Sequence, residues 1–138
     1  MSKKNQLILG SIIGLKKESE EQYIALHKHT FPEVLERIRQ SNISDYTIFH
    51  RDGILFSHMI YSGTNYEEDM LAMGSDISTQ EWWKLTDPMQ KPLEYRKKNE
   101  WWAEINLWFS HEVPILNGEK VMRLMKQRPG VPASSLRI

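Results

Sequence analysis

The sequence predicts an α+β fold in which an antiparallel sheet carries its helices on one face. Three observations predict it. Short runs of alternating apolar and polar residues are typical of strands, and segments between them have helical spacing and helical start signals. The order along the chain is strand, helix, strand, strand, helix, strand. That order is the ferredoxin-like βαββαβ arrangement, which in its dimeric α/β-barrel form pairs two copies.

The first strand is predicted over residues 6–15, a run rich in Leu and Ile that places Gly10 and Gly14 on the same side. Lys3 and Lys4 before this run give it some likeness to a signal peptide. The run is followed by charged residues without a small-residue cleavage site, and it is shorter than the roughly 20 residues that a membrane span needs. We therefore interpret it as a buried strand and expect a cytoplasmic protein.

The first helix is predicted to begin after Ser19, a residue type that caps helix N-termini, with acidic residues in its first turn. It is expected to run to about His29. Pro32 lacks a backbone N–H and is favoured at a first helical position, so it predicts the start of a second helical piece. Apolar residues at helical spacing then extend this piece to about Ser41.

A hairpin is predicted next, with strands over 44–51 and 54–62 joined at Asp52-Gly53, a strong tight-turn signal. Alternation in the first of these strands places three side chains on one face: Tyr46, Ile48 and His50.

Two further helical pieces are predicted over 66–73 and 78–86. The second opens at Ser78 with Glu81 three residues later, which is the pattern of a capping box. The last strand is predicted over Ala103–His111. Helices on one face leave the other face of the sheet bare, so we expect a homodimer in which a second copy covers it.

Composition indicates a single globular domain, 40% hydrophobic and 26% charged over 138 residues. We assign residues 1–112 to this domain and 113–138 to a C-terminal tail, extended or with a short helix. Eighteen basic residues balance eighteen acidic ones, so nucleic acid and membrane surfaces are not expected partners. The absence of Cys excludes disulfides, thiolate catalysis and Cys-type zinc sites.

Tyr23 and His27 are four residues apart on the first predicted helix, so their side chains share one face. A phenol beside an imidazole suits proton transfer at hydroxyl groups, because His titrates near neutral pH. From these two residues alone, a Tyr and a His that merely cover a helix surface remain the more common interpretation.

Five tryptophans occur in the chain, four of them in the adjacent pairs Trp82-Trp83 and Trp101-Trp102. Neighbouring residues on a helix point about 100° apart, so one ring of a helical pair must face a pocket, an interface or solvent. Indole rings suit the C–H faces of sugars and keep an N–H to donate. Packing in the core or at an interface explains the tryptophans equally well.

The sequence contains no motif for a metal, a phosphate or a nucleic acid. The five histidines show no HxxxH or HExxH spacing, and no Gly-rich phosphate loop occurs. We expect a metal-free site without a cofactor. Several carboxylates, among them Glu67, Glu68 and Asp69, are interpreted as solvated helix faces.

Three blocks of the sequence, in order, resemble the L-rhamnose mutarotase family. Residues 21–27 (E-Q-Y-x-x-x-H), followed by Phe31-Pro32-Glu33-Val34, resemble the opening helix of that family. Residues 45–49 (D-Y-T-I-F) resemble its next strand. Residues 82–89 (W-W-K-L-T-D-P-M) resemble its W-W-K-x-[TS]-D-x-M segment. The blocks lie within one βαββαβ frame and cover roughly residues 6–111.

The resemblance implies a dimeric protein that interconverts the α and β anomers of L-rhamnose without a cofactor, as an aldose 1-epimerase-type mutarotase. At the matching positions, His27 resembles the proton-donating histidine of the family. Four further residues resemble the sugar-binding residues of the family: Tyr23, Tyr46, Trp82 and Trp83. Mutarotation needs a proton delivered to the ring oxygen and one removed from the anomeric hydroxyl, and an imidazole can supply the first.

Residues 90–102 match no pattern of the family, and Asn106-Leu107-Trp108 stands where a Glu-Val-Phe type ending is expected. The substrate can therefore be another deoxy sugar, such as L-fucose, or a sugar acid. Two other classes stay open: a dimeric sugar-binding or regulatory module, and a small cofactor-less monooxygenase that acts on a flat aromatic substrate.

Overall fold

The computed structural model describes residues 6–111, so the tail predicted at 113–138 lies outside the described residues. Its sheet has the strand order β2-β3-β1-β4, with β5 also paired to β1, and every pairing is antiparallel. The strands are β1 (Leu7–Leu15), β2 (Ile43–Arg51), β3 (Ile54–Tyr61), β4 (Gln90–Lys91) and β5 (Ala103–Ile105). The α-helices are α1 (Glu20–His27), α2 (Pro32–Gln40), α3 (Tyr66–Gly74) and α4 (Ile77–Thr86), with single 3₁₀ turns at Lys17–Ser19 and Asp87–Met89. The predicted α+β class is confirmed.

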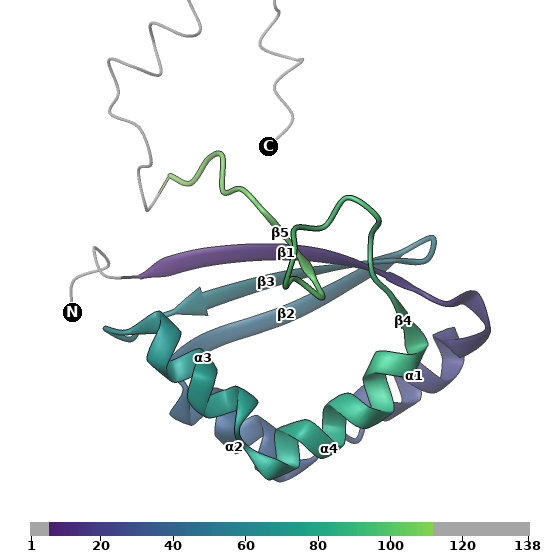
Figure 1. Cartoon of the computed structure of the whole chain (residues 1–138), viewed down its shortest axis with the longest axis horizontal. Helices are drawn as coiled ribbons and strands as arrows, with labels where there is room; N and C mark the ends of the chain where they lie inside the picture. Colours follow the sequence, from purple (N-terminus) through teal and green to yellow (C-terminus); the bar gives the residue numbers. More distant parts are fainter. Residues whose placement is uncertain (1–5, 112–138) are drawn as a thin grey trace, which may run out of the picture.

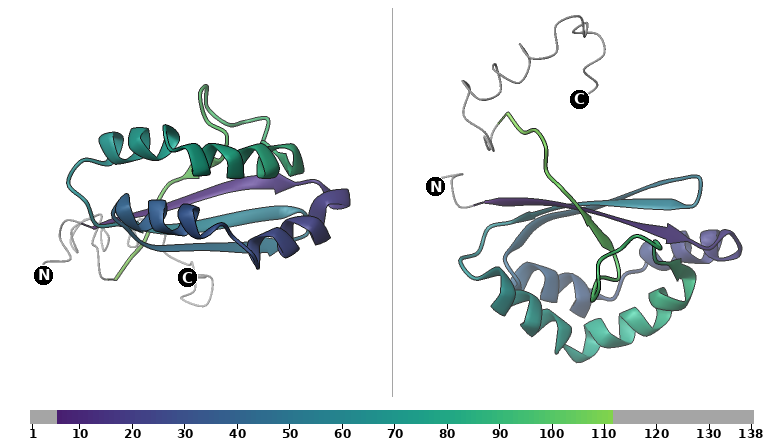
Figure 2. Two further views of the ribbon diagram at one scale, coloured as in Figure 1. Left: turned by 90° about the horizontal axis from the view of Figure 1, so that it is seen from below. Right: turned by 45° about the horizontal axis from the view of Figure 1, so that its top comes forward.

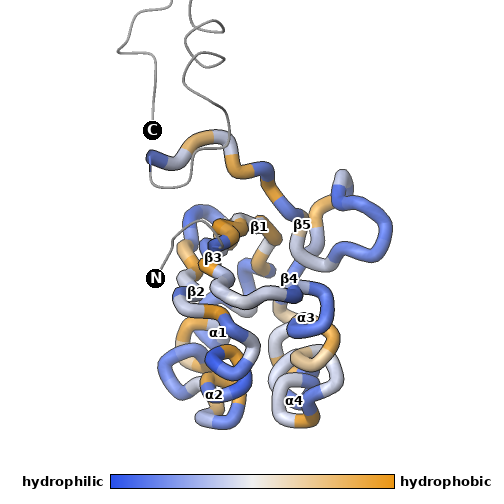
Figure 3. Tube along the Cα trace, turned by 90° about the vertical axis from the view of Figure 1, so that its left-hand side faces the viewer, coloured by the Kyte–Doolittle hydropathy of each residue, from blue (hydrophilic) through white to orange (hydrophobic). Residues whose placement is uncertain are grey.

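The α-helices lie on one side of the sheet and form two arms, α1 with α2 and α3 with α4, which run side by side (Figures 1 and 3). The arms meet where α2 packs against α4. Among residues 6–111, no helix combines the length and the apolar character that a membrane crossing requires.

Strand register assigns the two faces of the sheet. Ile13 lies opposite Leu55, and both are buried on the side of the helices. They form the core together with Leu15, Tyr23 and Met89. Neighbouring residues of a strand point to opposite faces, so Gly10 and Gly14 lie on the open face, on the same side as each other as predicted.

The hairpin between β2 and β3 turns at Asp52 and Gly53, whose φ angles of 48° and 76° are both positive. Positive φ at both central residues is the requirement of the tight turn that Asp-Gly predicts. The turn fixes the register of β2 against β3. Tyr46, Ile48 and His50 share one face of β2, as the alternation predicts, and the register shows that this face is on the side of the helices.

The prediction of one continuous last strand over Ala103–His111 is wrong. The edge beside β1 is filled by two short pieces: β4 pairs with Gly14 and Leu15, and β5 pairs with residues 10–12. Residues 92–102 leave the sheet between them, and after β5 the chain runs past the face opposite the helices (Figure 2). Alternation after Ile105 gave a strand pattern, but a strand also requires a paired backbone.

Local side-chain bonds move two helix ends away from the predicted positions. The N-cap of α4 is Asp76 rather than Ser78, because its carboxylate accepts the Thr79 N–H at 2.9 Å. The first helix ends at His27 rather than near His29, and the Thr30 hydroxyl donates to the His27 carbonyl at 3.0 Å. This bond satisfies one of the carbonyls that a helix end leaves open.

Asp69 is not the freely solvated carboxylate that its place in an acidic helix turn suggested. The buried Tyr61 donates its hydroxyl proton to Asp69, and the Asn42 amide donates to the same oxygen at 2.9 Å. These hydrogen bonds lower the pKa of Asp69. Asp69 therefore ties α3 to the sheet.

Candidate active site

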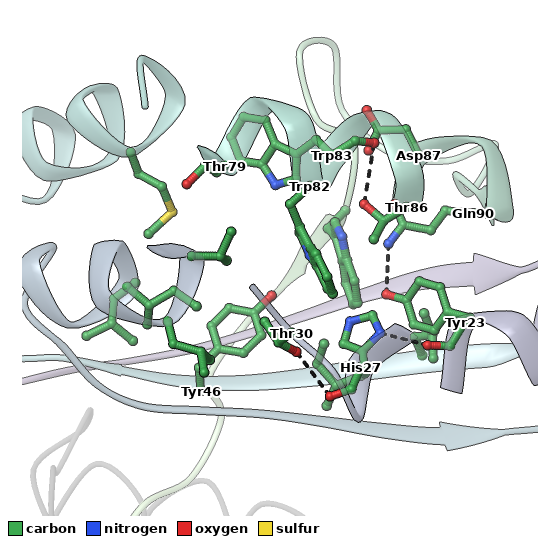
Figure 4. Close-up of a pocket in the computed structure, with 18 of the residues that line it drawn as sticks. Tyr23, His27, Thr30, Tyr46, Thr79, Trp82, Trp83, Thr86, Asp87 and Gln90 are labelled. Atoms are coloured by element: carbon green, nitrogen blue, oxygen red, sulfur yellow. Dashed lines mark hydrogen bonds between the residues drawn. The ribbon is translucent and has the colours of Figure 1, made fainter. Parts of the chain in front are cut away.

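A cleft of about 1140 Å³ lies between the helices and the sheet. Its walls come from α1, α2, β2, α4 and the residues around β4 and β5 (Figure 4). The structure brings together all five residues that the sequence singled out, because each of them lines this cleft: Tyr23, His27, Tyr46, Trp82 and Trp83. Their roles in binding and catalysis stay predictions.

His27 lies in the last turn of α1, between two aromatic rings. Its ring centroid is 4.3 Å from that of Tyr23 and 5.2 Å from that of Trp82, which it meets edge to face. The Nδ1 atom lies 2.9 Å from the backbone carbonyl oxygen of Tyr23. A carbonyl only accepts, so Nδ1 carries a proton and Nε2 is the nitrogen left to exchange one with a ligand (Figure 4).

The two tryptophans of α4 differ in burial, as adjacent residues of a helix must. Trp82 is buried and also meets Phe31 edge to face, with ring centroids 5.1 Å apart. Trp83 is 40% exposed. Trp82 reaches down from α4 toward His27 and forms an apolar wall beside the imidazole, while Trp83 offers a partly solvated surface (Figure 4).

Tyr46 projects from β2 with its hydroxyl inside the cleft (Figure 4). Desolvation there raises the pKa of this hydroxyl to about 12. The group therefore keeps its proton at neutral pH and is available as a neutral hydrogen-bond donor or acceptor.

Tyr23 is both a core residue and a cleft residue. Its ring is only 4% exposed and packs in the core cluster. Its hydroxyl accepts a hydrogen bond from Gln90 Nε2 at 3.0 Å, and Gln90 Oε1 accepts one from Trp101 Nε1 at 2.8 Å. Burial is the largest cause of the raised pKa of Tyr23, with a smaller contribution from the nearby charge of Asp87.

Asp87 lies on the rim of the cleft, at the C-terminal end of α4. Burial raises the pKa of its carboxyl group. Burial is the sole cause of this shift, and within residues 6–111 no hydrogen-bond donor or cation is paired with the carboxylate, so its oxygens are available to a ligand.

Sequence reasoning missed three residues that shape the cleft: Asp87, Gln90 and Trp101. Asp87 lies inside the 82–89 block, and the resemblance assigns it no role. Trp101 belongs to a Trp pair whose role the sequence leaves open. Gln90 has no sequence signal of its own, because its importance comes from contacts with residues 67 positions earlier and 11 positions later.

The fold and the cleft define a ferredoxin-like α+β protein with an aromatic, partly buried cleft. The chain belongs to the L-rhamnose mutarotase family, whose sequence pattern matches residues 9–111. The recognised family is thereby confirmed. Membership supports an L-rhamnose mutarotase-type function, which is an isomerase-type activity.

Two solved structures are similar in fold. One is an L-rhamnose mutarotase from Formosa agariphila, at a TM-score of 0.60 and 18% sequence identity, with 77% of this chain and 99% of that chain covered. The other is tetracenomycin F2 cyclase from Streptomyces glaucescens, at a TM-score of 0.56 and 14% identity, with 78% and 99% covered. Among curated proteins, no relative matches the sequence.

Proposed function

We propose that the protein interconverts the α and β anomers of L-rhamnose, or of a similar deoxy sugar, by acid–base opening of the pyranose ring. The observation that carries the proposal is the setting of His27. Its Nδ1 is held by the Tyr23 carbonyl, its Nε2 is left for a ligand, and Trp82 lies beside it as an apolar wall. Aromatic walls suit the C–H face of a sugar and the methyl group of a 6-deoxy sugar.

The reaction transfers two protons between the protein and the sugar and transfers no other group. Protonated His27 gives the Nε2 proton to the ring oxygen while the bond between this oxygen and the anomeric carbon breaks. The anomeric hydroxyl loses its proton to a base, and its oxygen becomes the carbonyl of the open aldehyde. After rotation about the bond from the carbonyl carbon to its neighbour, the reverse steps close the ring as the other anomer. General acid–base catalysis of this kind contributes about 10²–10⁴-fold.

We propose Asp87 as the base that takes the anomeric proton. Its carboxylate lines the same cleft as His27 and has no partner among the described residues of the protein. A carboxylate with a raised pKa holds a proton better than an ordinary one, which suits a group that must accept and return a proton within one turnover. Tyr23 and Tyr46 are weaker candidates, because their raised pKa values keep both phenols protonated.

Exchange NMR on a panel of aldoses tests the proposal. The protein should accelerate α–β exchange of L-rhamnose, or of a related deoxy sugar such as L-fucose, above the spontaneous rate. His27→Gln should abolish the acceleration, whereas His29→Gln, a change on the same segment but outside the cleft lining, should retain it. If no aldose shows faster exchange, the protein is not a mutarotase for this panel and the proposal fails.

The size of the cleft favours two other candidate functions. At about 1140 Å³ it exceeds the roughly 300–1,000 Å³ of typical small-molecule pockets and leaves space beyond a monosaccharide. A binding or regulatory module, or a cofactor-less monooxygenase for a flat aromatic substrate, would use that space. Saturable quenching of Trp fluorescence by a sugar without faster exchange would favour the module, and quenching by flat aromatic compounds alone would favour the monooxygenase.

We also propose that the protein is a homodimer that pairs through the open face of the sheet. Three large apolar side chains on this face are exposed: Phe49 at 59%, Phe56 at 40% and Ile105 at 43%. A second copy would bury them against an equivalent surface. Sedimentation should report a dimer that Phe56→Lys dissociates, whereas Leu71→Lys, at an exposed position of α3, should leave the mass unchanged.

A further inference from the structure

The segment between β4 and β5 is linked to the cleft by a chain of two hydrogen bonds that runs from Trp101 through Gln90 to Tyr23. Trp101 Nε1 donates to Gln90 Oε1 at 2.8 Å, and Gln90 Nε2 donates to the Tyr23 hydroxyl oxygen at 3.0 Å. Gln90 is 5% exposed and Tyr23 is 4% exposed, so water has little access to the hydrogen bond between them. All three residues line the cleft.

Only one direction of hydrogen bonding fits these three groups. An indole N–H donates and cannot accept, so the Gln90 atom that faces Trp101 must be the carbonyl oxygen. The amide nitrogen then faces Tyr23 and donates to its oxygen. A flipped amide would set its NH₂ group against the indole N–H, leaving the buried Gln90 donor without an acceptor, which disfavours that orientation.

The direction of this chain decides what Tyr23 can do. Because its oxygen already accepts from Gln90, the hydroxyl proton of Tyr23 is not used by the chain and remains to be donated elsewhere. None of the hydrogen bonds within residues 6–111 uses that proton. Asp87 lines the same cleft, and its charge acts on the Tyr23 hydroxyl and raises the Tyr23 pKa.

We propose that Trp101 and Gln90 are positioning residues that hold Tyr23 as a hydrogen-bond donor to an oxygen acceptor of the ligand. The sugar as ligand rests on the proposed function, but the direction of the chain does not. The site would then select ligands with an oxygen lone pair at this position, as pyranose hydroxyls and ring oxygens have. It would reject a protonated amino sugar whose ammonium group, a donor only, replaces that oxygen.

The assignment gives a role to residues 90–102, a segment for which the sequence alone predicts no function. Within this segment β4 is only two residues long, so its pairing with β1 fixes Gln90 while the following residues bulge outward. Trp101 is 42% exposed and is not a member of the core cluster. A residue whose main contribution were packing would be buried, whereas an indole at the rim can act through its N–H alone.

Two substitutions test the direction of the chain. In Gln90→Glu, the carboxylate accepts from Trp101 and also from Tyr23, which consumes the Tyr23 proton. In Trp101→Phe, the indole donor is lost and the amide of Gln90 becomes free to flip. Trp108→Phe is the matched control, because Trp108 is 82% exposed and lies outside the cleft lining.

The first readout needs no sugar. NMR of the ¹³Cζ nucleus of tyrosine follows the ionisation of Tyr23, whose phenolate the Gln90 amide stabilises. Gln90→Glu should raise the Tyr23 pKa above that of the unchanged protein, because a carboxylate replaces a donor. Trp101→Phe should raise it to a lesser extent, and Trp108→Phe should leave it unchanged. If neither site variant moves the Tyr23 titration, the chain does not set the state of Tyr23 and the proposal is overturned.

The second readout is exchange kinetics with the sugar that the protein accelerates. Loss of one hydrogen bond to the ligand is worth about 1 kcal/mol, so the apparent KM should rise roughly fivefold in Trp101→Phe while kcat stays within about twofold. A fall in kcat with unchanged KM would overturn the donor role. A shifted Tyr23 titration in a protein that accelerates no sugar would support the chain and refute the proposed function instead, so the two failures are distinguishable.

Discussion

Asp87→Asn should make the protein more stable and less active at neutral pH. Asp87 occupies the C-terminal end of α4, where the helix dipole is negative and disfavours a carboxylate. Burial disfavours the charged form further and raises the pKa of Asp87. Both effects act on the charge, and an amide of nearly equal shape removes them. A carboxylate that costs stability and has no partner is the pattern of a group kept for function.

The dipole contribution sets the magnitude of the gain. A charge in the last turn of a helix interacts by about 0.3–1 kcal/mol, which corresponds to an increase in Tm of roughly 1–8 °C for a domain near 100 residues. Because the folded-state pKa is raised, the penalty exists only where Asp87 is ionised. It should be complete above the folded-state pKa and should vanish once the pH falls below the unfolded value of 3.8.

Thermal unfolding at pH 7 and at pH 3, beside exchange NMR at pH 7, measures both halves of the prediction. Asp69→Asn is the matched control with the opposite sign, because its hydrogen bonds to Tyr61 and Asn42 lower its pKa and stabilise the folded protein at pH 7. The reasoning is refuted if Asp87→Asn lowers the Tm at pH 7, since the carboxylate would then have a stabilising partner. Undiminished exchange in this variant would remove Asp87 as the base.

Three further predictions follow from single contacts. Tyr61→Phe removes the hydroxyl that bonds Asp69 and the Asn65 N–H, and urea unfolding should show a loss of about 1–3 kcal/mol; an unchanged midpoint would contradict the tie between α3 and the sheet. Gly14→Ala would place a Cβ 2.6 Å from the Lys91 carbonyl oxygen, and it should lower the Tm and raise the KM because it displaces the neighbouring Gln90. Gly74→Ala, whose new Cβ would have nothing within 4 Å, should stabilise the protein by up to about 1 kcal/mol, and equal effects of the two changes would refute the clash. Tyr46→Phe should raise the KM roughly fivefold and leave the pH profile unchanged from pH 6 to 9, because a pKa of about 12 keeps the hydroxyl neutral there; a changed profile would show that Tyr46 ionises in that range.

Elements whose signals are local were predictable from the sequence, and those that depend on distant partners were not. The turn at Asp52-Gly53 and the restart at Pro32 follow from backbone preferences of single residues, and both were correct. The last strand failed because alternation measures only the side chains. Only residues 103–105 pair with β1. The pairing depends on where the backbone rejoins the sheet after residues 92–102, and the alternation of side chains does not predict that position.

The site divides in the same way. His27, Tyr23, Tyr46 and the tryptophans of α4 carry residue types that suit sugar chemistry, so pattern and resemblance found them. The link between Gln90 and Trp101 depends on the strand register at Gly14 and Leu15, which no spacing predicts. A glutamine is also too common in proteins to be a signal by itself. The structure was needed to show which donor faces which acceptor.

Tyr23 has a structural role and a proposed functional role at the same time. Its ring is a member of the core cluster, and its hydroxyl reaches the cleft through the edge of that core. A packed ring holds the oxygen in one place, and the Gln90 amide then fixes which way its proton is available. The burial that marks Tyr23 as structural is therefore also what makes it a rigid donor. Tyr23→Phe should retain the fold and lose the donor, whereas Tyr23→Ala should lose about 3–5 kcal/mol of stability as well. Urea unfolding and exchange kinetics on the two variants separate these contributions, and equal stability of the two would contradict the packing role of the ring.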